Sequence, residues 1–136
     1  MSIFEAIISV IYQYAVFAGR ASRSEFWYWQ LSAFLVGVAT LMLDMAAFPD
    51  SKLSPINAIF RLMVFVPTLA VGARRLHDIG RTGWWQLLWL VPVAGWIVII
   101  VFACIKGDEQ SNQYGDNPLA IEQDPQAHLF RHSYYR

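Results

Sequence analysis

Three long apolar runs, separated by charged junctions, dominate the pattern of the chain. They cover residues 26–48, 56–73 and 82–105, and the only Asp, Glu, Lys, Arg or His inside them are Asp44 and Arg61. Each run approaches or exceeds the roughly 20 residues that an α-helix needs to cross the hydrocarbon layer of a membrane. The pattern predicts an all-α integral membrane helical bundle with three transmembrane helices, at about 24–47, 55–76 and 83–105.

The first eighteen residues have a different pattern. Polar side chains recur every three or four positions and form one narrow stripe, consisting of Ser2, Glu5, Ser9 and Gln13, while nearly all other positions are apolar. This predicts an N-terminal interfacial amphipathic helix at about 3–18. Gly19 can end that helix, and Ser22 with Glu25 fits a capping box at the start of the first span.

The composition changes again after residue 105, where the chain becomes polar and rich in turn-forming residues. We therefore divide the chain into a single membrane domain, residues 1–118, and a polar, partly disordered tail over 107–136.

The arginines predict the orientation, because positive charge in short loops stays on the cytoplasmic side. They cluster before the first span and between the second and third: Arg20, Arg23, Arg74, Arg75 and Arg81. This places the N-terminus in the cytoplasm, both clusters at one membrane face and, with three spans, the tail at the opposite face. In an alternative topology Pro92 and Gly95 fold the third run into a hairpin, which returns the tail to the cytoplasm.

Composition supports the membrane interpretation and narrows the partners. Apolar residues make up 57% of the chain and charged residues 15%, mean hydropathy is +0.39, and the formal net charge is zero. A chain without excess positive charge has no overall attraction for nucleic acid, so we expect membrane lipids, and no nucleic acid, among its partners. The single cysteine, Cys104, excludes an internal disulfide.

Several motifs carry a family resemblance. They are GRASRSEFW at 19–27, PTLAVGARRLHDIGRTGWW at 67–85, PVAGW at 92–96 and NQYGDNP at 112–118. With these motifs the chain resembles the small bacterial inner-membrane proteins of the YhaH/YhaI type, the domain of unknown function 805 family, from about Tyr12 to Pro118. Gln113 departs from this pattern, because the family often has arginine there. The resemblance implies a helical fold in the bacterial inner (plasma) membrane and no established reaction.

The two charged junctions supply the candidate site. Its members are Arg20, Arg23, Glu25, Arg74, Arg75, His77, Asp78 and Arg81. Guanidinium groups suit a lipid phosphate, so one interpretation is a site for anionic headgroups or for a partner protein. The competing interpretation is a self-paired turn that joins two helices, in which Glu25 meets an arginine across the helix interface.

No catalytic, cofactor-binding or metal-binding residue is predicted. His77 and Asp78 are adjacent on a helix and do not face each other, and no serine or cysteine nucleophile lies at a suitable spacing.

The charges inside the spans predict a second contact. In an antiparallel hairpin, Asp44 and Arg61 lie at similar depths from the loop end, so we expect an intramembrane ion pair between them. Snorkelling of both side chains to the interface is the alternative.

The sequence thus favours a non-enzymatic integral inner-membrane protein with a cytoplasmic-face Arg/His/Asp/Glu cluster. One alternative is a subunit of a small oligomeric transporter or channel, for which Ala33, Gly37 and Gly72 offer close-approach surface to a homo-oligomer or membrane-protein partner. A lipid-headgroup enzyme acting through His77 is a further alternative.

Overall fold

The computed structural model describes residues 1–123, and these confirm the all-α prediction: they contain helices, turns and one isolated β-bridge, but no strand. The predicted tail reaches residue 136, so its last part lies outside the described residues. The helices in chain order are α1 (Ile3–Tyr12), α2 (Arg23–Ala47), α3 (Pro55–Asp78), the 3₁₀ helix η1 (Gly83–Leu90), α4 (Ala94–Cys104) and α5 (Pro118–Gln123).

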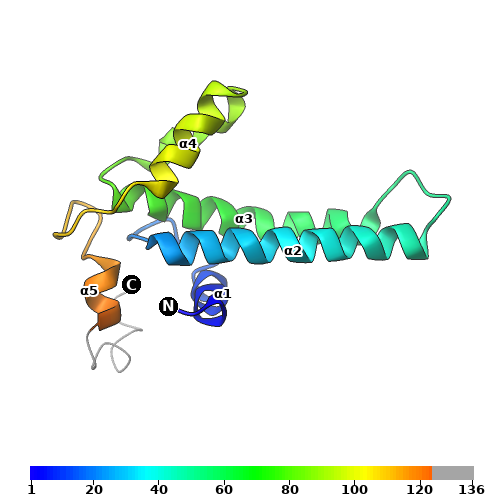
Figure 1. The fold of residues 1–136 in the computed structure, drawn as a ribbon, viewed down its shortest axis with the longest axis horizontal. Coiled ribbons are helices and arrows are strands. Elements are labelled where there is room, and N and C mark those ends of the chain that lie inside the picture. The colour runs from blue at the N-terminus through cyan, green and yellow to red at the C-terminus, as the bar shows by residue number, and fades with distance from the viewer. Residues whose placement is uncertain (124–136) are drawn as a thin grey trace.

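Helices α2 and α3 form a long antiparallel hairpin that is the axis of the molecule (Figure 1). The Ser22 hydroxyl caps α2 by accepting a hydrogen bond from the Glu25 amide at 3.2 Å, as predicted. The other half of the predicted capping box does not form, because the Glu25 carboxylate accepts from Ser9 and Arg74 instead. Pro55 occupies the first turn of α3, where its missing N–H is not needed. Both helices are long and apolar enough to cross a membrane.

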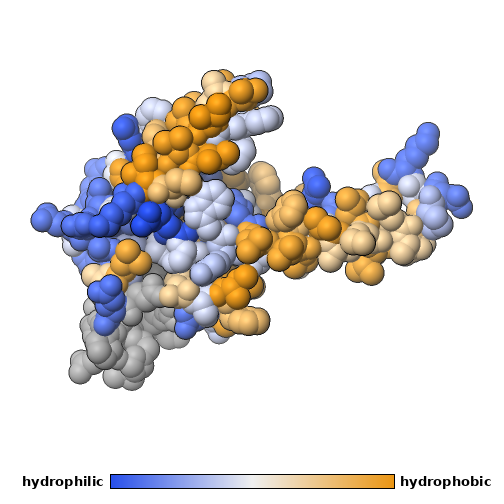
Figure 2. Space-filling view, in the orientation of Figure 1, coloured by the Kyte–Doolittle hydropathy of each residue, from blue (hydrophilic) through white to orange (hydrophobic). Residues whose placement is uncertain are grey.

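The hairpin exposes apolar side chains along most of its length, as the orange surface in Figure 2 shows. Only 6% of the most apolar window of α2 is buried, and 28% of that of α3. Phe34 is 67% exposed, Met42 66% and Leu62 75%. In water such a continuous apolar surface would drive association, whereas in hydrocarbon it is the expected exterior.

The third apolar run is not one helix, so the predicted span over 83–105 is wrong. Helix η1 ends at Leu90 and α4 starts at Ala94, and the two lie side by side as a short arm (Figure 1). Between them Val93 has φ +63° and ψ −70°, and the Ala94 amide donates to the Pro92 carbonyl at 2.8 Å, which defines a γ-turn. The hairpin alternative is therefore the one that the structure contains.

Proline and glycine explain the break. Pro92 cannot donate a helical hydrogen bond, and Gly95 packs so closely on η1 that a Cβ there would lie 1.9 Å from the Leu88 carbonyl oxygen. The indole of Trp96 then donates to the Trp89 carbonyl at 3.1 Å, which joins the two halves of the arm.

Helix α1 is shorter than the predicted 3–18 and ends at Tyr12. The second half of its polar stripe, Ser9 and Gln13, is buried, whereas Ser2 and Glu5 are exposed, as are Phe4 (74%) and Ile8 (53%). The helix therefore presents large apolar side chains outward while Ser9 and Gln13 lie inward, an arrangement suited to a lipid environment.

Candidate functional site

The predicted cluster assembles where α2 begins and α3 ends, and its centre is a buried carboxylate shared by two arginines. Asp78 Oδ1 accepts from Arg20 Nε at 2.9 Å, and Asp78 Oδ2 accepts from Arg75 Nη1. All three side chains are buried. Arg75 also donates to the carbonyls of Ala103 and Ile105, so the same group fixes the end of α4. These buried groups hold the fold together.

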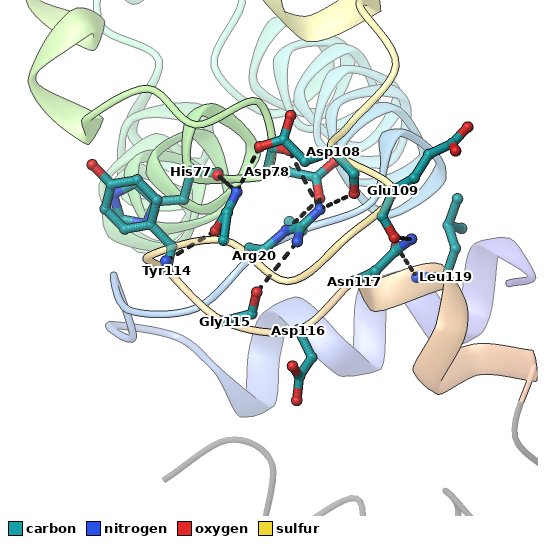
Figure 3. A network of polar contacts seen from close by, with 12 residues as sticks. Arg20, His77, Asp78, Asp108, Glu109, Tyr114, Gly115, Asp116, Asn117 and Leu119 are labelled. Atoms are coloured by element: carbon teal, nitrogen blue, oxygen red, sulfur yellow. Dashed lines mark hydrogen bonds and ion pairs between the residues drawn. The ribbon is translucent and has the colours of Figure 1, made fainter.

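Besides Asp78, Arg20 binds the backbone of residues 108–115, the segment that follows α4 (Figure 3). Its guanidinium donates to the carbonyls of Asp108, Gln110 and Gly115, at 2.8 Å for Gln110 and 3.2 Å for Gly115. The Asp108 amide donates to the Asp78 carbonyl at 2.8 Å. The start of the predicted tail therefore lies at the same end of the hairpin as the arginines, and the prediction that the tail falls at the opposite face is wrong.

We call the contacts that hold residues 108–115 against the end of α3 the clasp. His77 belongs to this clasp rather than to a catalytic pair. Its ring stacks on Tyr114 with centroids 3.9 Å apart, its Nδ1 lies 3.1 Å from the Gly19 carbonyl oxygen, and its own carbonyl accepts from Asn112 Nδ2 at 2.9 Å (Figure 3). The neighbouring Asp78 carboxylate faces arginines and does not orient the imidazole. Within residues 1–123, no group of three or more His, Cys, Asp or Glu side chains is arranged to hold a metal ion.

A second buried pair joins the three N-terminal helices. Arg74 Nη1 donates to Glu25 Oε1 at 2.9 Å, which confirms the expected contact of Glu25 with an arginine across the helix interface. The Ser9 hydroxyl donates to the same oxygen at 3.1 Å, and Gln13 Nε2 donates to Ser9 Oγ at 3.0 Å. Arg74 is fully buried, and its Nε and Nη2 have no hydrogen-bond partner in the described part of the chain.

Two arginines of the predicted set remain exposed. Arg23 makes one long hydrogen bond, 3.5 Å from Nη1 to the Cys104 carbonyl. The Arg81 guanidinium lies 5.4 Å from the Trp85 ring centroid and 5.6 Å from that of Phe102, a cation–π arrangement. Neither has an ion-pair partner among the described residues, so these two can receive an external anion.

The loop after α4 adds one more exposed cation, Lys106, which pairs with Glu109. The hydrogen bond and the positive charge of Lys106 lower the pKa of the Glu109 carboxyl. This ion pair is open to solvent and contributes little to stability.

Asp44 and Arg61 do not form the predicted ion pair. Asp44 instead caps α3, since its two carboxylate oxygens accept from the amides of Ile56 at 3.0 Å and Asn57 at 2.8 Å. Arg61 Nε donates to Asn57 Oδ1 at 2.7 Å, one turn away on its own helix. The open amides at a helix N-terminus satisfy a buried carboxylate without any cation, and this explains the difference.

Comparison with known proteins places the chain in a family. The family described as "Protein of unknown function (DUF805)" matches residues 14–116. Inner membrane protein YhaI of Escherichia coli (strain K12) is 39% identical over 111 residues, which cover 82% of this chain and 92% of that protein. The chain belongs to the DUF805 family. Inner membrane protein YhaH of the same strain is 37% identical over 115 residues, 82% of this chain and 93% of that protein. No solved structure matches.

The residues that match the DUF805 family include the whole clasp but not helix α1. Residues 14–116 include every arginine of the cluster together with Asn112, Tyr114 and Gly115, whereas α1 with Ser9 precedes the match. The two spanning helices and the relatives together support a membrane protein.

Sequence reasoning missed several residues of this DUF805 cluster. Ser9 and Gln13 were placed on a stripe without a partner, and Asn112 and Tyr114 were placed in a tail. A signal for the second pair existed, because both belong to the NQYGDNP motif that carries part of the resemblance. Nothing in the spacing showed that the stripe would face Glu25.

Proposed function

We propose that this DUF805 protein is a non-enzymatic, multi-pass inner-membrane protein, with its N-terminus in the cytoplasm, that binds anionic lipid headgroups at its charged end. Arg23 and Arg81 receive the headgroup phosphate. Arg20, Arg74 and Arg75, with Glu25, His77 and Asp78, hold the scaffold that positions them. The observation that carries the proposal is the division of one arginine cluster into a buried, paired set and two exposed arginines.

Charge and aromatic residues at the same end support the proposal. The buried set has three guanidinium groups and two carboxylates, so its side chains carry one excess positive charge. Trp27 is 41% and Trp84 78% exposed beside the two junctions, as expected for rings at the lipid–water boundary. Exposed arginines beside aromatic anchors suit an anionic leaflet.

The two alternatives from the sequence have less support. Gly37 packs against Phe60, with 3.6 Å from a Cβ position to the ring, and Gly72 packs against Gln86. These small residues therefore serve contacts within the chain and do not argue for a second copy. An enzyme acting through His77 would need a free imidazole, and this one is stacked on Tyr114.

Lipid binding measured by native mass spectrometry tests the proposal. We expect the wild-type protein to bind phosphatidylglycerol in preference to zwitterionic phosphatidylcholine. The double variant Arg23→Ala/Arg81→Ala should weaken phosphatidylglycerol binding about 30-fold, because each arginine near an anionic lipid contributes about 1 kcal/mol.

The control removes two positive charges at the other end of the hairpin, as Lys52→Ala/Arg61→Ala, and should bind like the wild type. Equal binding of both lipids by the wild-type protein, or equal losses in the two double variants, would refute the proposal.

A further inference from the structure

A groove lies beside the exposed Arg23, between the α2–α3 hairpin and the arm. Phe26 and Gln30 of α2 line one side, Thr68 and Leu69 of α3 the second, and Trp89 and Ile99 of the arm the third. Figure 2 shows the apolar arm standing away from the hairpin, with strongly hydrophilic atoms at its foot. The volume is about 80 Å³, and since about 10–15 Å³ holds one water-sized group by this measure, a short length of acyl chain fits.

The lining is apolar except for four side chains, and three of these, Thr68, Arg75 and Gln86, already have partners; those of Arg75 are Asp78 and two carbonyls, as described above. Thr68 Oγ1 accepts from the indole of Trp29 at 3.0 Å, and Gln86 Nε2 donates to the Leu69 carbonyl at 3.2 Å. Gln30 differs: its half-buried amide has no hydrogen-bond partner anywhere in residues 1–123. An unpaired amide is costly at membrane depth, so a ligand that supplies an acceptor would be stabilised here.

Arg23 lies in line with this groove. Arg23, Phe26 and Gln30 follow the i, i+3, i+7 spacing of one helix face, and Arg23 touches the Cys104 carbonyl, next to a further lining residue, Ala103. Seven residues of α-helix place Gln30 about 10 Å below Arg23 along the axis. A glycerophospholipid has the same order of groups, with a phosphate, then ester carbonyls, then acyl chains.

We propose that this groove is a glycerophospholipid site, in which Arg23 binds the phosphate, the Gln30 amide donates to an ester carbonyl, and one acyl chain lies between α2, α3 and the arm. This inference rests on the proposed function for its headgroup and adds a separate ligand contact. The ester carbonyl is the part of the lipid that makes the contact testable by itself.

The experiment compares two phosphatidylglycerols with identical headgroups and chain lengths, one diacyl and one dialkyl, which lacks the carbonyls. The wild-type protein should bind the diacyl lipid roughly tenfold more tightly, about the worth of one hydrogen bond. Gln30→Leu keeps the size of the side chain and should bind both lipids equally. Equal binding of the two lipids by the wild-type protein would overturn the proposal.

Filling the groove gives a second measurement. Leu69→Trp should weaken binding of both lipids, whereas Leu62→Trp, the same change two turns earlier on α3 at a position 75% exposed, should bind like the wild type. Leu69→Ala, which opens the groove, should retain binding and shows that this position tolerates change. Undiminished binding by a folded Leu69→Trp variant would contradict the acyl-chain position.

The two proposals fail differently. If the Arg23→Ala/Arg81→Ala variant loses phosphatidylglycerol but the wild type does not distinguish diacyl from dialkyl lipid, the headgroup function stands and the groove is refuted. If the wild type prefers diacyl lipid but does not distinguish phosphatidylglycerol from phosphatidylcholine, the groove stands and the anionic-headgroup function is refuted.

Discussion

Neutralising Glu25 should destabilise the protein strongly, because it leaves Arg74 as a buried and uncompensated cation. Arg74 is fully buried, its single side-chain hydrogen bond goes to the Glu25 carboxylate at 2.9 Å, and its other two nitrogens have no partner in the described chain that could compensate. Breaking a buried ion pair by removing one partner costs about 3–5 kcal/mol. We expect Glu25→Gln, which keeps the shape and an acceptor for Ser9, to lower the free energy of unfolding by about 3 kcal/mol or more.

The assay is reversible unfolding in mixed detergent micelles, followed by the fluorescence of the six tryptophans. Adding Arg74→Met to Glu25→Gln removes the unpaired buried charge and should recover at least about 2 kcal/mol of the free energy of unfolding. Only residues that interact show such a coupling. Glu109→Gln, which breaks the exposed pair with Lys106, is the control and should leave the unfolding midpoint unchanged. A loss below about 1 kcal/mol for Glu25→Gln, or additive effects in the double variant, would refute this reasoning.

Three further predictions concern the clasp, the helix cap and the arm. Arg20→Ala removes the bonds that hold 108–115, so backbone amides there should exchange hydrogen faster; unchanged exchange would contradict the clasp. Asp44→Ala removes the cap of α3 and should cost about 0.5–2 kcal/mol in the same unfolding assay, whereas Asp50→Ala in the exposed loop should cost nothing measurable. Gly95→Ala cannot fit beside the Leu88 carbonyl and should lower the melting temperature; a wild-type melting temperature would argue against the close packing of the arm.

The parts of the fold that depend on the length of an apolar run or on local spacing could be predicted from the sequence. The two long helices followed from the length of their apolar runs, and the Ser22 cap followed from local spacing. The third run lacks charged residues but contains Pro92 and Gly95, so its shape depended on how tightly two half-helices pack. Hydropathy does not measure packing, and for that reason it predicted one helix where the structure has two.

The sequence predicted which residues form the candidate site, but not which of them are buried and which are exposed. The five arginines of the cluster could be placed at one end from the charge pattern, yet which of them are buried depends on contacts between distant segments. Arg20 is buried because residues 108–115 fold back over it, and Arg23, three positions later, is exposed. The predicted ion pair between Asp44 and Arg61 was wrong for a similar reason, because the backbone amides at the start of α3 bind the Asp44 carboxylate instead.

Labelling with a membrane-impermeant thiol reagent tests most directly that both charged junctions and the segment after the arm lie on one side of the membrane. In a Cys104→Ser background, single cysteines replace exposed Ala18 before α2, exposed Ser51 in the α2–α3 loop and exposed Ser111 in the clasp. Intact cells and inverted vesicles expose opposite faces to the reagent. Ala18→Cys and Ser111→Cys should react from the same side, and Ser51→Cys from the other. If Ser111→Cys reacts together with Ser51→Cys, the third run crosses the membrane, and the two-span hairpin with its short arm is contradicted.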